Sequence, residues 1–481
     1  MSGEPTTDER MSDVDKIIWV IEANPQLRST ITGVMFFDQA PDRAALHTRV
    51  ERTTRRVARL RQRVVSNPYS LAPPRWELDP AFNLNYHLRW AHLGGAGTHA
   101  NVLSLAEPIA MQSFDKARPL WEITVIEGLA LDAAAVVIKV HHTITDGVGG
   151  VQLMLELFDL ERDPPVDPEM PPEPVGRVLG QTERFRDALV HELHRRHAFA
   201  KHAADGLADL ARSPVDGARR GVDTALSALR MAQPITRPMS PLLEAKSLSV
   251  RFATISRPLT AFRTAARACD ASVNDIFVAG LCRGLSIWHI EKGLRVSTLR
   301  MGMPISSRRE GASPATGANQ FLPTRFEVPL GIDDPRDHVL AVRALVRSQR
   351  DEPALALVEP LAGVISRLPR SVLTNLFAAL LRGQDFLASN VPGVPVPVYF
   401  AGAEVTAMFA FGPLSGTALN VTLLSHCDNV HIGINHDPET MHDTDALAIC
   451  LERGIDEVLA LGTPAAKAKS KAKAKKPTPR R

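Results

Sequence analysis

Two long stretches of the chain alternate between strand-like and helix-like patterns of apolar residues, the first over residues 11–160 and the second over residues 248–461. In the first stretch, residues 50–64 predict a basic amphipathic helix, and residues 134–140 form a β-branched run that predicts a buried strand. In the second, residues 259–268 predict a helix, and residues 274–290 have the length and apolar content of a core helix. We therefore expect an α/β protein with two lobes, each built on a mixed sheet flanked by helices.

The segment between these stretches differs in character. A proline-rich run over residues 163–175 predicts an extended connector. Residues 177–237 are rich in Ala, Arg and His and predict one or two amphipathic helices, broken near Ser213 and Pro214. The simplest interpretation is a solvated helical linker packed on the lobes, and the alternative is a helix that lies on anionic lipid.

The expected organisation follows from these boundaries. It consists of a disordered leader (1–10), an N-terminal lobe (11–175), a helical crossover (176–245), a C-terminal lobe (246–462) and a disordered basic tail (463–481).

The charge of the chain is distributed unevenly. There are 56 Lys and Arg residues against 53 Asp and Glu, a formal net charge of +3. Eight basic residues and no acidic ones lie between Lys467 and Arg481, and removing these eight charges from +3 leaves −5. The basic tail is compatible with nucleic acid, anionic lipid or simple solubility, but the acidic remainder shows no sign of a nucleic-acid surface. We therefore expect no nucleic-acid partner.

Composition and cysteine usage exclude several other classes. At 44% hydrophobic and 23% charged residues the chain is of ordinary globular composition, and no apolar run approaches the length of a membrane-spanning helix. The polar N-terminus is unlike a secretory signal. Four cysteines at irregular spacings predict neither a disulfide framework nor a zinc site, so a reducing cytosol fits.

The sharpest local feature is the segment His141-His142-Thr143-Ile144-Thr145-Asp146-Gly147, which directly follows the predicted buried strand. Three interpretations are open. The histidines can be satisfied polar residues at a strand end, or His142 and Asp146 can be metal ligands, or His142 can be a general base held rigidly by the strand.

The metal interpretation is the weakest, because a closed site needs more ligands than this segment supplies. The other candidate ligands are spread over strand-like sequence without a tight ligand pattern: His426, His431, His436, Asp437, His442 and Asp443. We expect no metal.

The segment HHTITDG matches the HHxxxDG signature of coenzyme A-dependent acyltransferases and peptide-synthetase condensation domains. Over residues 11–460 the chain resembles one branch of these, the bacterial wax ester synthase/acyl-CoA:diacylglycerol acyltransferase family. Further matching blocks occur in the family's order: Ser12-Asp13-Val14-Asp15, Pro119-Leu120-Trp121, Asn274-Asp275, Met303-Pro304-Ile305-Ser306 and Ser389-Asn390-Val391-Pro392-Gly393.

The resemblance implies two chloramphenicol-acetyltransferase-like lobes with an active-site tunnel at their interface. It assigns the role of general base to His142, makes His141 and Asp146 structural partners of the loop, and lets Gly147 leave space for the substrate carbonyl. It also implies substrate-binding residues, namely Pro119, Leu120, Trp121, Asn274, Asp275, Ser389, Asn390, Pro392 and Gly393.

Read locally, several of these residues have structural alternatives. Trp121 can be a core residue, Asn274 the N-cap of a helix, and the segment 389–393 a turn.

The implied reaction transfers a fatty acyl group from acyl-CoA, as co-substrate and with no cofactor, to the hydroxyl of diacylglycerol or of a long-chain alcohol. Alternatives are a carrier-protein thioester as donor, or a non-catalytic protein that binds lipid droplets. Lipid substrates imply a cytoplasmic protein attached peripherally to the inner face of the cell membrane or to lipid inclusions.

The chain departs from the family pattern at Val394-Pro395 and at Ser425-His426-Cys427-Asp428-Asn429. We expect these departures to affect acceptor preference more than catalysis.

Overall fold

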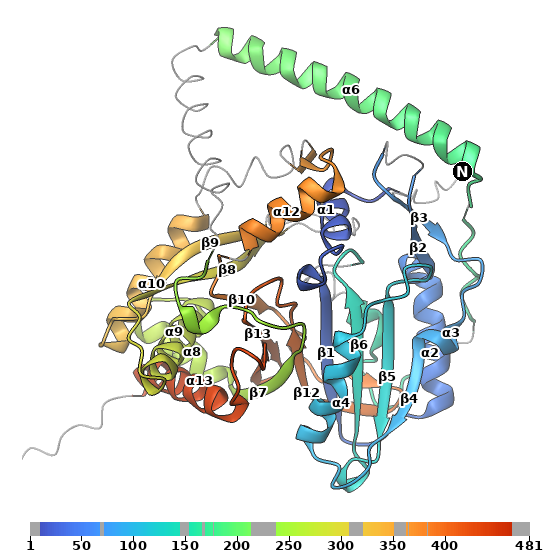
Figure 1. Cartoon of the computed structure of the whole chain (residues 1–481). Helices are drawn as coiled ribbons and strands as arrows, with labels where there is room; N and C mark the ends of the chain where they lie inside the picture. Colours follow the sequence, from blue (N-terminus) through green and yellow to red (C-terminus); the bar gives the residue numbers. More distant parts are fainter. Residues whose placement is uncertain are drawn as a thin grey trace, which may run out of the picture.

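Two six-stranded mixed sheets form the centre of the protein in a computed structural model (Figure 1). The structure describes residues 10–67, 72–144, 153–165, 169–176, 178–212, 237–306, 321–350, 362–363, 365–381 and 383–463. The leader before Arg10 and the basic tail after Thr463 lie outside these described residues.

The first sheet has the strand order β11-β12-β1-β6-β5-β4. Its strands are β1 (Thr30–Phe37), β4 (Leu88–His92), β5 (Trp121–Glu127), β6 (Ala134–His141), β11 (Tyr399–Phe400) and β12 (Ala403–Phe411). The remaining elements of this lobe are α1 (Asp13–Ile21), α2 (Arg43–Arg56), α3 (Leu84–His87), α4 (His99–Met111) and the short hairpin of β2 (Gln62–Val65) and β3 (Arg75–Leu78).

The strand β6 is buried on both faces, as predicted from its β-branched run. Residues 134–137 have no exposed surface. On one face the core contains Leu46 and Val50 of α2, and on the other it contains Val102 and Ala106 of α4. Because both neighbours of β6 are strands and both faces are covered, the residues that follow it start from a rigid position.

The second sheet has the order β7-β14-β13-β10-β8-β9. Its strands are β7 (Arg251–Pro258), β8 (Thr298–Ser306), β9 (Phe321–Pro329), β10 (Phe386–Val391), β13 (Leu419–His426) and β14 (Asn429–His436). The helices of this lobe are α8 (Leu259–Ala268), α9 (Val273–Glu291), α10 (Pro335–Arg350), α12 (Arg370–Leu381) and α13 (Thr444–Leu459). The bounds of α8 and α9 agree with those expected from the apolar pattern.

The C-terminal half of the chain contributes strands to both sheets. After β10 the chain enters the first sheet as β11 and β12, and β12 pairs antiparallel with β1, with Thr32 opposite Phe411. The expected lobe of residues 246–462 is therefore not confined to one sheet. Strand partners are set by tertiary pairing, which the local pattern of residues 399–411 does not encode.

Two local expectations need correction. Residues 50–64 are not one helix, because α2 begins at Arg43 and ends at Arg56, where Val57 leaves helical geometry (φ −106°, ψ 85°) before β2. Arg10, expected in the leader, forms a β-bridge with Arg75. The linker helix α6 is described over Gln181–Arg212, and the break expected near Ser213 and Pro214 lies outside the described part of the chain with residues 213–236.

None of the described helices combines the length and the apolar composition that crossing a membrane requires.

Candidate active site

The two adjacent histidines lie at the end of β6, and their backbone is held from both sides. The His141 amide donates to the Leu120 carbonyl (3.0 Å), and the His142 amide donates to the Ser29 carbonyl (2.8 Å). Leu120 directly precedes β5 and Ser29 directly precedes β1, the two neighbours of β6. The backbone of both histidines is thus fixed by the sheet itself.

His141 is a buried structural residue. Its side chain is 1% exposed, and its Nδ1 accepts a hydrogen bond from the Thr143 amide (3.1 Å). The same nitrogen lies 2.7 Å from the Thr143 hydroxyl oxygen, and Nε2 on the other side of the ring lies 2.8 Å from Oε1 of Glu22. His141 therefore connects the loop after β6 to Glu22, the residue that follows α1.

Glu22 is a carboxylate held ionised in a buried position. Burial acts to raise its pKa, but the contact with His141, the Ser29 amide (2.9 Å) and the Lys116 ammonium (3.4 Å) outweigh it and lower the pKa to about 2. Glu22 could not be recognised from the sequence. It lies 119 positions before His141 in the chain and belongs to no local motif, so only the pairing of β1 with β6 brings the two together.

The side chain of His142 is partly exposed, in contrast to that of His141. Of the two histidines it is the one that a substrate can reach. Asp146 and Gly147, the other catalytic candidates, lie outside the described residues.

Residues Pro119, Leu120 and Trp121 are buried in the first lobe. The Trp121 indole donates to the Leu60 carbonyl (2.7 Å) and stacks on the imidazole of His87, with 4.6 Å between ring centroids. Trp121 is thus a core residue, which was the structural alternative to a substrate-binding role. Leu120 acts through its backbone carbonyl, which receives the His141 amide.

The structure brings together two blocks that are distant in sequence. The side-chain amide of Asn390 donates from Nδ2 to Oδ1 of Asn274 (3.4 Å), which joins the start of α9 to the end of β10. The N-cap of α9 is Ser272, which forms a capping box with Asp275, so the expectation that Asn274 caps the helix is wrong. Asn274 is therefore available for a polar contact, whereas Asp275 stabilises the helix start.

The segment Ser389–Gly393 is not simply a turn. Ser389 and Asn390 belong to β10 and pair with β13, while Pro392 and Gly393 follow the strand. A Cβ atom at Gly393 would lie 1.7 Å from the Ser425 carbonyl oxygen, so only glycine fits here.

The two departures from the family pattern contact each other. Nδ1 of His426 lies 3.0 Å from the Val394 carbonyl oxygen, and the Cys427 amide donates to the same oxygen (3.1 Å). The departures at 394–395 and 425–429 therefore form one structural unit.

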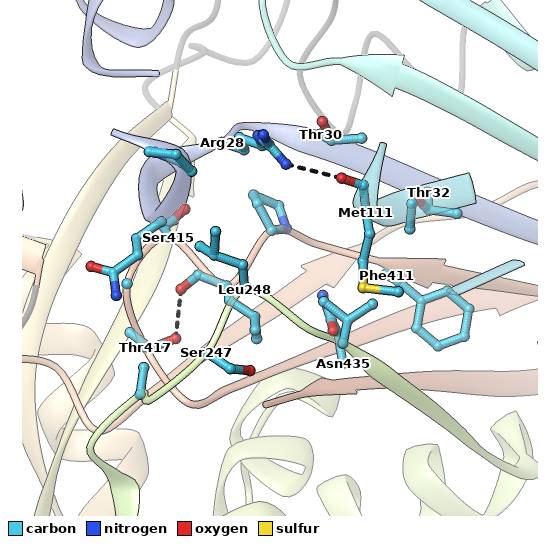
Figure 2. Close-up of a pocket in the computed structure, with 18 of the residues that line it drawn as sticks. Arg28, Thr30, Thr32, Met111, Ser247, Leu248, Phe411, Ser415, Thr417 and Asn435 are labelled. Carbon is cyan, nitrogen blue, oxygen red and sulfur yellow. Dashed lines mark hydrogen bonds between the residues drawn. The ribbon is translucent and has the colours of Figure 1, made fainter. Parts of the chain in front are cut away.

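A pocket opens at the interface of the lobes, next to the segment that holds His142. Arg28 and Thr30, the residues on either side of Ser29, line it together with Phe411 at the end of β12. The second lobe contributes residues 413–417 and Ala245, Ser247, Leu248, Val250, Phe252 and Asn435. Figure 2 shows side chains of both lobes around this pocket, with the Arg28 guanidinium donating to the Met111 carbonyl (2.9 Å). The pocket thus begins one residue from the backbone partner of His142.

Other candidate chemistries find little support among the described residues. There, no three His, Cys, Asp or Glu side chains gather into a group that could hold a metal ion. The histidines of the second lobe are bound separately, His431 to Ser256 and His436 to Thr444. Burial raises the pKa of each of the four cysteine thiols, which disfavours a thiolate nucleophile.

Two family models match the chain. Residues 11–277 match the wax ester synthase/diacylglycerol acyltransferase catalytic domain, and residues 318–458 match the C-terminal domain of the same family. A putative diacylglycerol O-acyltransferase of Mycobacterium tuberculosis is 37% identical over 472 residues, which cover 97% of this chain and 95% of that protein.

Solved structures share the fold. The wax ester synthase/diacylglycerol acyltransferase from Marinobacter aquaeolei VT8 superposes with a TM-score of 0.60 at 20% identity, covering 94% of this chain and 99% of that one. The first condensation domain of the calcium-dependent antibiotic synthetase superposes with a TM-score of 0.59 at 16% identity, covering 95% and 98%. These likenesses support the two-lobe chloramphenicol-acetyltransferase-like architecture.

Proposed function

The chain belongs to the wax ester synthase/diacylglycerol acyltransferase family, and we propose that it transfers a fatty acyl group from acyl-CoA to the hydroxyl of diacylglycerol, forming triacylglycerol. Long-chain alcohols, which would give wax esters, are the second acceptor class. The observation that carries this proposal is the position of His142, which is partly exposed at the end of a rigid strand and whose backbone partner Ser29 lies between two residues that line the pocket.

In the proposed mechanism His142 accepts the proton of the acceptor hydroxyl while the oxygen attacks the thioester carbonyl. The tetrahedral intermediate collapses, the carbon–sulfur bond breaks, and the proton on His142 passes to the departing CoA thiolate. The thioester is already an activated acyl group, so the reaction needs no cofactor. His141, fixed by Glu22 and Thr143, keeps the start of the loop in place.

The substrates also suggest where the enzyme works. Diacylglycerol and long-chain alcohols partition into lipid, so the protein has to meet a membrane or a lipid inclusion, and we place it peripherally on the inner face of the cell membrane or on such inclusions. The eight basic residues of the tail suit an anionic surface, where each contributes about 1 kcal/mol at best.

The decisive experiment is His142→Ala, assayed with labelled palmitoyl-CoA and either diacylglycerol or hexadecanol, with products separated by thin-layer chromatography. We expect kcat to fall by roughly 10²–10⁴-fold, the usual contribution of a general base, with an unchanged circular dichroism spectrum. His47→Ala, at an exposed position on α2, is the matched control and should retain wild-type activity.

Near-normal activity of a folded His142→Ala enzyme would contradict the assignment of His142 as the general base. If the wild type forms no ester from acyl-CoA but does so from a carrier-protein thioester, the donor assignment is wrong. If neither donor yields an ester, the protein is a lipid-binding protein rather than an enzyme.

A further inference from the structure

The helix α6 is fastened to the body of the protein along one of its faces. Arg184 donates two hydrogen bonds to the fully buried carboxylate of Glu77 (3.0 and 3.2 Å), and Asp187 pairs with Arg75 (2.7 Å). Further along α6, Arg195 pairs with Asp13 at the start of α1 (3.1 Å). Figure 1 shows α6 running along the edge of the molecule above α1 and α12.

The opposite face of α6 carries large apolar side chains in solvent. Leu189, Val190 and Leu193 are 46%, 44% and 58% exposed, and Phe185 is 40% exposed. Because an α-helix turns by about 100° per residue, Leu189 and Leu193 point away from the side on which Arg184 and Arg195 are bound. A contiguous apolar stripe of this kind on a surface marks an interaction site more often than scattered single residues do.

Positive charges predominate among the exposed side chains near this stripe. Arg186 is exposed on the same outward face, one turn before Val190, and Arg196 is exposed at the edge beside Leu189. Of the acidic residues on α6, Asp187 pairs with Arg75 and the Glu183 carboxylate accepts the Gly180 amide at the start of the helix (3.0 Å). The Glu192 carboxylate lies 3.0 Å from Arg196, on the edge toward the body. An apolar stripe bordered by arginines complements the interface of an anionic bilayer, where apolar side chains enter the acyl region and cations meet phosphate groups.

We propose that the outward face of α6, formed by Leu189, Val190 and Leu193 with Arg186 and Arg196, docks the enzyme on an anionic lipid bilayer. This inference rests on the proposed function, since the acceptor has to be collected from lipid. It replaces the interpretation of α6 as a merely solvated linker and assigns the lipid contact to a defined helix face.

The position of α6 relative to the histidines fits this role. Arg195 binds the first residue of α1, and Glu22, directly after the last residue of α1, contacts His141. The nine residues of α1 span about 14 Å at 1.5 Å per residue. A bilayer docked on the outward face of α6 would therefore be separated from His141 by the length of α1 and the width of α6, which is roughly 10–12 Å.

The test is co-sedimentation of the full-length protein with vesicles of equal parts phosphatidylglycerol and phosphatidylcholine. The variant carries Leu189→Glu and Leu193→Glu together, and the matched control is Ile449→Glu on α13, which is 55% exposed on the second lobe. The assay is repeated in about 0.5 M salt, where the Debye length falls to a few ångströms and attraction by the basic tail is screened.

We expect the partition coefficient of the α6 variant to fall at least tenfold at both salt concentrations, while that of the control stays within twofold of the wild type. With diacylglycerol presented in vesicles the activity of the α6 variant should fall in parallel, whereas with detergent-dispersed substrates it should remain unchanged.

Equal vesicle binding by the α6 variant and the control would overturn the proposal. It would also be overturned if light scattering showed that the substitutions dissociate a dimer without changing vesicle binding, because the stripe would then cover a second copy of the chain. A wild type that forms no ester would refute the acyltransferase function alone, since the vesicle assay still decides the role of α6.

Discussion

At the scale of single residues, the pair formed by His141 and Glu22 is the feature that the structure adds to the histidine motif. The motif itself could be found in the sequence, because adjacent histidines after a β-branched run and before glycines stand out locally. Glu22 could not, because its role depends on the register that places β1 beside β6. The exposure difference between His141 and His142 is likewise a property of the folded sheet.

Replacing the Glu22 carboxylate tests whether its contact with His141 stabilises the folded protein. Its pKa of about 2 in the folded protein lies below the ordinary value of 4.5, so ionised Glu22 stabilises the fold above pH 4.5, and this stabilisation is lost as the pH falls from 4.5 to 2. For Glu22→Gln we expect the free energy of unfolding at pH 7 to fall by about 2–3 kcal/mol, since one pKa unit corresponds to roughly 1.4 kcal/mol. Urea unfolding of both proteins at pH 7 and pH 3 measures this change in the free energy of unfolding.

The difference between wild type and Glu22→Gln should shrink at pH 3, and a difference that stays constant with pH would contradict the assignment. Glu127→Gln is the control, because Glu127 pairs with the exposed Arg43 at the surface. Such surface pairs contribute about 0–1 kcal/mol, so this substitution should change little at either pH.

At the scale of elements, the close packing of α9 on α13 depends on two glycines. A Cβ atom at Gly454 of α13 would lie 2.1 Å from the backbone nitrogen of Gly284 in α9. Alanine has a helix propensity about 1 kcal/mol better than glycine, but here it would force the helices apart. We expect Gly454→Ala to lower the free energy of unfolding by about 1–3 kcal/mol, measured by urea denaturation.

The matched substitution is Gly94→Ala, where an added Cβ meets no atom within 4 Å. It should leave the stability within about 0.5 kcal/mol of the wild type, as surface substitutions usually do. If Gly454→Ala were equally harmless, the two helices would not pack as closely as their glycines indicate.

The elements that could be predicted from the sequence are those whose pattern is strong and local. The helix α8 was expected over residues 259–268 and has these bounds, and β6 was expected as a buried strand. The pairing of β12 with β1 could not be predicted, because an alternating strand carries no mark of the sheet that it joins. The boundary of α2 was misplaced because Arg-rich residues after Arg56 continue a helical pattern that the backbone does not follow.

At the scale of the whole molecule, the two lobes are connected by more than the linker. The strand β12 belongs to the first sheet but is followed directly by β13 of the second. The buried carboxylate of Glu107 in α4 pairs with Arg251 (2.6 Å) and accepts the Phe252 amide (3.0 Å) at the start of β7. These connections cross the interface that contains the pocket, so we expect the lobes to unfold together.

Because the lobes are coupled, buried histidines in either lobe make the stability of the whole molecule depend on pH. Burial lowers the pKa of His87 in the first lobe, and of His431 and His436 in the second, to about 4 in each case. An unfolded histidine has a pKa near 6.5, so between pH 6.5 and pH 4 the unfolded chain binds protons that the folded protein excludes, and stability falls as the pH falls. Above pH 6.5 the three imidazoles are neutral in both states and contribute no pH dependence.

We expect the free energy of unfolding to drop steeply from pH 6.5 to pH 4, with tryptophan fluorescence and near-ultraviolet circular dichroism giving coincident urea transitions at each pH. His431→Gln should reduce the drop by up to about 3 kcal/mol, the value that corresponds to a shift of 2.5 pKa units. His47→Gln should leave the drop unchanged, because the histidine on the exposed face of α2 is solvated in both states. A drop of the same size in His431→Gln would show that His431 is protonated in the folded protein, and two separate transitions would show that β12 and Glu107 do not couple the lobes.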